Sequence, residues 1–166
     1  MAALPRRRRR RPDGVPLEPG ERVLASAAGD TGVVVATDRR LLVPQPDGHL
    51  GIGWETIERA TWDGDGELLT IVQTAPLGSR PRTHRLKLED AGRLLDVVRE
   101  QVTASVVISR YVLLDGRRGV RITGRRRPGQ SGLSWVVAVD NGLSVDAPGV
   151  RDQIASAVAR VRAEVE

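Results

Sequence analysis

Short apolar segments separated by tight-turn residues fill the chain between Gly32 and Trp62, where the sequence reads GVVVATDRRLLVPQPDGHLGIGWETIERATW. An apolar segment leads into the turn Thr37-Asp38-Arg39-Arg40, and a second segment leads into the turn Asp47-Gly48. Asp-Gly between two extended runs is a strong hairpin signal, because both residues tolerate the backbone of a tight turn. This region therefore predicts a meander of antiparallel strands.

The strand pattern continues on both sides and then gives way to a helix. Six or seven strands are expected, with His49–Trp54 and Thr56–Trp62 forming either one bent strand or two. Helical spacing of apolar residues predicts a helix over residues 89–103, with Glu89 and Asp90 in its first turn. The other predicted strands are Arg22–Ala27, Gly32–Thr37, Arg40–Pro44, Glu67–Gln73 and Thr83–Leu88.

The chain contains, in order, an apolar strand, TDRRLL, a short turn, an apolar run and Trp54-Glu55-x-Ile57. This order resembles that of the bacterial pleckstrin-homology-like (PH-like) domains, relatives of the GRAM family. The resemblance covers about residues 21–103. It implies a strongly bent antiparallel sheet whose terminal helix covers one open end. It also implies a binding module and points to no particular reaction.

Residues 104–166 repeat the pattern of strands followed by a helix. Strands are expected at Val106–Leu114, Val120–Arg127, Leu133–Asp140 and Leu143–Val145. Asp146 is expected to cap a last helix with Pro148 in its first turn. This βββ(β)α unit could extend the first sheet or form a second unit. We favour a second unit packed on residues 21–103, since each helix needs an apolar face to cover. The predicted fold class is α+β, mainly β.

Positive charge is concentrated in two places. Of the net charge of +5, Arg6–Arg11 supply six positive charges, and residues 12–166 hold 20 basic against 21 acidic groups. Residues 110–127 contain seven arginines against Asp115 alone. Residues 1–20 hold four prolines and no apolar periodicity, so they are expected to form a disordered arginine-rich arm.

Both basic segments suit an anionic partner. Arg121, Arg125 and Arg127 would share one strand face if Gly124 introduces no bulge. Nucleic acid is the alternative partner, because a run of arginines releases counterions from phosphate backbones. Attraction to an anionic membrane would be weak and salt-sensitive, since no apolar anchor lies beside the arm. The candidate residues are Arg6, Arg7, Arg8, Arg9, Arg10, Arg11, Arg117, Arg118, Arg121, Arg125 and Arg127.

Catalytic chemistry is not expected. The chain has no cysteine, and its two histidines, His49 and His84, fall in separate predicted strands. Asp63-Gly64-Asp65-Gly66 lacks the later ligands of a calcium loop and predicts a tight turn. We therefore predict no enzyme, cofactor or metal, but a cytoplasmic binding or scaffold protein with an unknown protein partner. Trp54 and Trp62 are expected to pack in the core.

Overall fold

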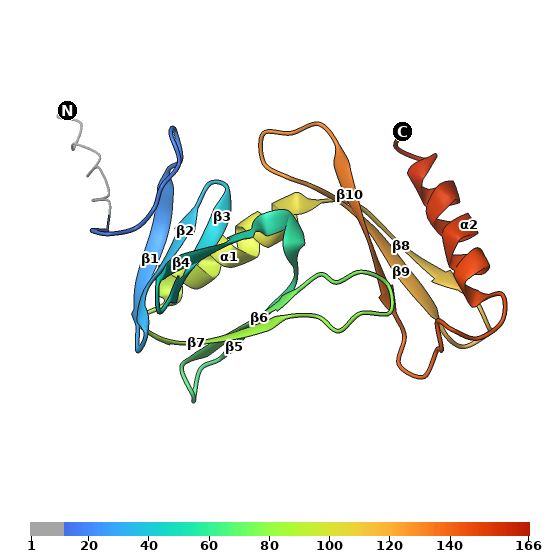
Figure 1. Ribbon diagram of the computed structural model, residues 1–166, viewed down its shortest axis with the longest axis horizontal. Coiled ribbons are helices and arrows are strands. Elements are labelled where there is room, and N and C mark those ends of the chain that lie inside the picture. The colour runs from blue at the N-terminus through green and yellow to red at the C-terminus, as the bar shows by residue number, and fades with distance from the viewer. Residues whose placement is uncertain (1–11) are drawn as a thin grey trace, which may run out of the picture.

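The computed structural model describes residues 12–166, which contain two β-sheets and two α-helices (Figure 1). The mainly β, α+β class is therefore confirmed. The strands are β1 Val23–Gly29, β2 Gly32–Thr37, β3 Arg40–Gln45, β4 Gly48–Gly53, β5 Ile57–Asp63, β6 Leu68–Gln73, β7 Thr83–Glu89, β8 Val106–Leu113, β9 Gly119–Arg126 and β10 Leu133–Val139. The helices are the single 3-10 turn η1 Trp54–Thr56 and the α-helices α1 Gly92–Ser105 and α2 Val150–Arg162.

The first sheet has seven antiparallel strands in the order β4-β3-β2-β1-β7-β6-β5. Strands β1 and β7 are paired only at Ala28–Glu89 and Gly29–Leu88. A four-stranded and a three-stranded part thus meet at one corner, and β4 and β5 lie at the two outer edges.

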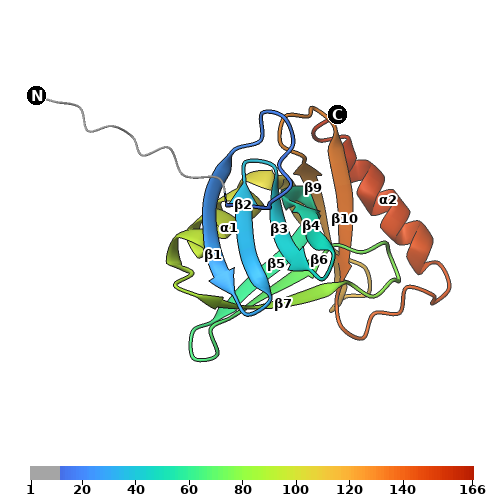
Figure 2. The ribbon, with the colours of Figure 1, turned by 60° about the vertical axis from the view of Figure 1, so that its left-hand side comes forward.

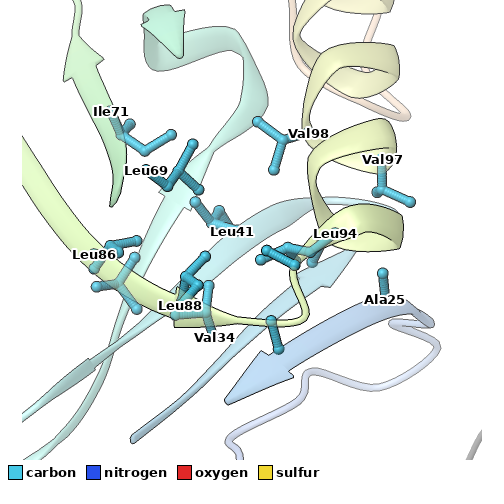
Figure 3. Close-up of a cluster of buried hydrophobic side chains, with 14 of the residues drawn as sticks. Ala25, Val34, Leu41, Leu69, Ile71, Leu86, Leu88, Leu94, Val97 and Val98 are labelled. Atoms are coloured by element: carbon cyan, nitrogen blue, oxygen red, sulfur yellow. The ribbon is translucent and has the colours of Figure 1, made fainter. Parts of the chain in front are cut away.

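Helix α1 covers the core of this sheet. Its Leu94, Val97 and Val98 are at most 2% exposed and belong to one cluster with side chains of both sheet parts. Figure 3 shows Leu94 and Val98 on the side of α1 toward Leu41 and Leu69, and Val97 on the side toward Ala25. Burying such an aliphatic side chain contributes about 1.5–3 kcal/mol each, so the helix and the sheet hold each other in place.

Two boundaries in this region differ from the predicted ones. Trp54 begins the turn η1 instead of ending a strand, and of the two predicted alternatives the structure has two separate strands. Its ring is fully buried and its indole N–H donates to the carbonyl of Thr37 at 3.0 Å, as core packing predicts. Helix α1 begins at Gly92, and Asp90 has the left-handed φ of 47°. The expectation that Glu89 and Asp90 form its first turn is therefore wrong.

The second sheet has three antiparallel strands in the order β10-β9-β8, and α2 packs on one of its faces (Figure 2). Ile154, Ala157 and Val161 of α2 meet Val120 and Ile122 of β9 in a separate apolar cluster. The predicted strand at residues 143–145 is wrong, because turn and irregular backbone occupies those positions. The predicted cap Asp146 is also wrong: Gly149 is the N-cap of α2, and Asp146 pairs with Arg151.

The N-terminal segment is ordered further toward its start than predicted. Val15 is only 3% exposed and packs with Leu17 against Val35 and Leu42, on the face of the first sheet opposite the α1 core. The expectation that residues 1–20 are disordered is therefore wrong for residues 12–20. Residues 1–11 lie outside the described part of the chain.

A buried ion pair fastens this segment to the TDRR turn. The carboxylate of Glu21 is fully buried and accepts hydrogen bonds from Arg40 Nε at 2.9 Å and Nη2 at 3.0 Å. It also accepts bonds from Thr37 Oγ1 at 2.7 Å and from the Glu18 backbone N–H at 2.8 Å. Burial raises the pKa of Glu21, but the bonds from Arg40, Glu18 and Thr37 outweigh it and lower the pKa from 4.5 to about 2. The TDRR turn thus has a structural role, because it holds the N-terminal segment through Glu21.

We predict that Glu21 makes folding pH-dependent in the acid range. Its folded pKa lies below the unfolded value, so its contribution is complete above about pH 4.5 and is lost as the pH falls toward 2. The shift corresponds to about 3 kcal/mol. Glu21→Gln should lower the free energy of unfolding at pH 7 by about that amount and flatten the pH dependence below 4.5, as measured by urea denaturation.

The exposed carboxylate of Glu18, paired with Arg39 at 3.1 Å, provides a matched control. Glu18→Gln should cost less than about 1 kcal/mol, since exposed pairs contribute little. If Glu21→Gln and the unchanged chain lost stability in parallel between pH 4.5 and 2, the assignment to Glu21 would be refuted.

Candidate functional site

The predicted arginines of the second unit do not form one exposed strip. Arg117 and Arg118 lie in the β8–β9 turn, where their backbone N–H groups donate to Asp115 Oδ1. The Arg118 side chain donates to the Gly142 carbonyl at 3.1 Å. At the opposite end of β9, Arg127 lies 4.0 Å from the Glu55 carboxylate of the first unit. The positive charges are therefore split between the two ends of the hairpin, and part of them is already paired.

Arg121 and Arg125 share a face of β9, as the alternation predicts, but only Arg121 is exposed. Its guanidinium lies 5.8 Å from the ring centre of Tyr111. The register shift in this hairpin falls at Val106–Ile108 of β8, opposite Gly124. Arg6–Arg11 lie outside the described residues, so the structure places none of the arm's side chains.

The side chain of Arg125 is buried and forms hydrogen bonds within the chain. It is 6% exposed, and it donates to Ser105 Oγ at 3.0 Å and to the Glu58 carbonyl at 3.5 Å. Burial lowers the pKa of its guanidinium, and the Glu58 charge opposes that shift. Arg125 thus joins β9 to the end of α1 and to the start of β5. It belongs to the contact between the two units and is removed from the set of exposed anion-binding residues.

A groove between β5 and α1 is a candidate site because it combines an outermost strand with an apolar helix face. It encloses about 600 Å³ and runs between the outermost strand of the first sheet and one long side of the helix. Its apolar lining is contributed by Trp62, Leu69, Leu95, Val98 and Val102. Its polar lining is contributed by Glu58, Arg59, Thr61, Asp96, Arg99 and Thr103.

The spacing of residues in α1 explains the helix wall of this groove. Positions 92, 95, 96, 99, 102 and 103 recur every three or four residues and therefore share one helix face. Leu94, Val97 and Val98 turn the neighbouring face into the core. Leu95 and Val102 are only partly buried, at the margin of the core. The apolar stripe of α1 is therefore wider than the face that enters the core, and these two residues line the groove.

Trp62 forms the strand side of the groove and is 38% exposed. It lies directly across from Leu69 in the β5–β6 ladder, so its ring extends the inner face of the sheet toward solvent. The expectation that Trp62 is core is therefore only partly right. A tryptophan on an outermost strand followed by a wide helical stripe is the sequence signal that could have located this groove.

The rim of the groove carries both signs of charge. Asp96 and Arg99 are 3.6 Å apart on α1, and Glu58 and Arg59 follow each other on β5. An apolar floor with a mixed rim suits a polypeptide better than a polyanion, because a polyanion needs clustered positive charge.

The histidines and the DGDG sequence lie in ordinary structural settings. His49 Nε2 bonds to the Val33 carbonyl at 3.0 Å, and His84 Nε2 bonds to Gln73 Oε1 at 2.8 Å. Burial and the charge of Arg82 lower the pKa of His84. Asp63 Oδ1 accepts bonds from the backbone N–H groups of Asp65 and Gly66. DGDG is therefore the predicted tight turn.

Comparison with protein-family models, curated proteins and solved structures finds no match to this chain. Within residues 12–166, neither α-helix has the length and apolar character needed to cross a membrane.

Proposed function

We propose that this chain is a non-catalytic, PH-like binding module of the cytoplasm that holds an extended segment of a partner protein in the β5–α1 groove. The observation that carries the proposal is the groove itself, in which an outermost strand runs beside an apolar helix face. The PH-like part of the proposal is supported by the order of seven antiparallel strands followed by a helix that covers the core.

The groove suits an extended chain because β5 is an outermost strand. A segment pairing with β5 would gain main-chain hydrogen bonds, and its alternate side chains would enter the apolar lining. The carbonyl of Glu58, at the start of β5, already accepts a hydrogen bond from Arg125. Residues 59–63 therefore remain for pairing, which favours a short segment of about five residues with two or three apolar side chains on one face.

We predict that Trp62 dominates binding. Purified chain would be used to select binders from a random peptide library, and their affinity measured by titration calorimetry. Trp62→Ala should raise the Kd about tenfold or more, because a partly exposed tryptophan at an apolar groove is a typical hot spot. Val165→Ala, which shortens an apolar side chain of similar exposure (42%) at the C-terminus, should leave the Kd unchanged.

Hydrogen exchange of the complex locates the bound peptide. We expect slower exchange of the β5 and α1 amides when a selected peptide is present. Protection at the second sheet alone, or equal loss of affinity in Trp62→Ala and Val165→Ala, would rule out this groove as the binding site.

An anionic partner is the second part of the proposal and is supported by the six consecutive arginines at residues 6–11. The arm would add salt-sensitive attraction for a partner held in the groove. For nucleic acid as the alternative partner, the logarithm of the binding constant falls with the logarithm of salt concentration by about 0.9 for each phosphate neutralised.

We predict that the arm sets this salt dependence. Deleting residues 1–11 should reduce the slope for a short DNA duplex by up to about 5. The double variant Arg117→Ala/Arg126→Ala removes two exposed charges, one near each end of β9. It should reduce the slope by about 2 at most. Filter binding measures both slopes. If the intact chain retained neither DNA nor RNA at low salt, the nucleic-acid alternative would be discarded.

A further inference from the structure

Strand β8 is an exposed edge of the second sheet. Its inner side pairs with β9, and no strand within residues 12–166 pairs with its outer side. The other edge of this sheet, β10, is approached by the β6–β7 loop, whose Leu77 packs with Val137 of β10 in the second apolar cluster. Among residues 12–166, the remainder of the chain thus covers the β10 edge of the second sheet and leaves the β8 edge unpaired.

Four of the five exposed residues of β8 are apolar, and the fifth is Arg110. Val106 is 36% exposed, Val107 40%, Tyr111 44% and Leu113 56%. These residues make up four of the seven large apolar side chains exposed within residues 12–166. The concentration of such side chains on one strand marks an interaction surface.

The strand has neither the proline nor the short length that often keep sheet edges apart. Edge strands are normally protected by charged residues, proline, bulges or a short length. Strand β8 has eight residues without glycine or proline, and its register shift is confined to Val106–Ile108. Its one charged residue, Arg110, pairs with Glu164 on the α2 side at 2.7 Å. Two copies of this edge can therefore approach each other without like-charge repulsion from an unpaired group.

We propose that β8 pairs antiparallel with β8 of a second copy of this chain, joining two three-stranded sheets into one of six strands. A two-fold axis beside Ser109 places Val107 of one copy opposite Tyr111 of the other, twice over. Val107, Ser109 and Tyr111 alternate with the α2-facing Ile108 and Arg110, so all three lie on the same open face. Pairs of an aromatic and a β-branched residue are among the more favourable cross-strand contacts.

A second copy fits this edge better than another segment of the same chain. Residues 1–11 hold six arginines and offer little apolar surface. The two-fold arrangement is also self-complementary, because it brings Val107 of each copy beside Tyr111 of the other. The Tyr111 ring lies against Arg121 and its hydroxyl donates to Asp140 of its own chain, so its position is fixed before pairing. An interface built on one strand per copy is small, and interfaces below about 1,200 Å² are typically weak. The dimer should therefore form and dissociate with protein concentration.

Light scattering during size-exclusion chromatography tests this pairing on the full chain. The mass should rise from 18.0 kDa toward twice that value as the protein is concentrated. Val107→Lys should keep the mass at 18.0 kDa. Val33→Lys, at a valine of similar exposure (37%) in β2 of the first sheet, should dimerise like the unchanged chain. A monomer at every concentration, or equal dimerisation of both variants, overturns the proposal.

A cross-link provides a second readout that does not depend on placing a charge in β8. The chain has no cysteine, so Ser109→Cys carries a single thiol beside the proposed axis. Directly opposed residues of antiparallel strands lie about 4.5–5.5 Å apart, a separation that a disulfide spans. Mild oxidation should link Ser109→Cys into a dimer and leave Val33→Cys largely monomeric. Equal cross-linking of the two variants would mean random collision and would refute the pairing.

Discussion

The burial of one face of α1 in the open side of the seven-stranded sheet is the constraint on which the rest of the structure depends. Leu94, Val97 and Val98 close a core that the two parts of the sheet, joined at a single corner, cannot close alone. Truncating one such leucine to alanine typically costs 2–5 kcal/mol. The strands of the first sheet and α1 are therefore expected to unfold together.

The position of α1 also determines which surfaces the molecule exposes. With one face in the core, the adjacent face lies beside β5 and forms the wall of the groove. The C-terminal end of the helix runs directly into β8, so it fixes where the second sheet begins. Arg125 then joins that sheet to Ser105 and Glu58. One buried helix thus links the groove of the first unit to the exposed edge of the second.

Local sequence patterns were sufficient for most of the fold but not for the candidate site. The apolar run of β2 and the Asp47-Gly48 turn act over a few residues, and the predicted bounds of β2 are confirmed. Leu143–Val145 also has a strand-like composition, yet no strand within residues 12–166 pairs with it. The groove needed tertiary information, because the exposure of Trp62 depends on how far α1 lies from β5. The prediction that Arg125 is exposed is wrong for the same reason. The strand pattern correctly predicts which face of β9 it lies on, but residues of the first sheet and α1 bury its side chain.

Native-state hydrogen exchange of α1 tests the central role of this helix most directly. If α1 closes the core, the amides in the middle of Gly92–Ser105 should exchange only through global unfolding, with the same opening free energy as the slowest amides of β2 and β3. Helix amides that open at a much lower free energy, while β2 and β3 stay protected, would show that the sheet holds its core without α1 and would contradict the account.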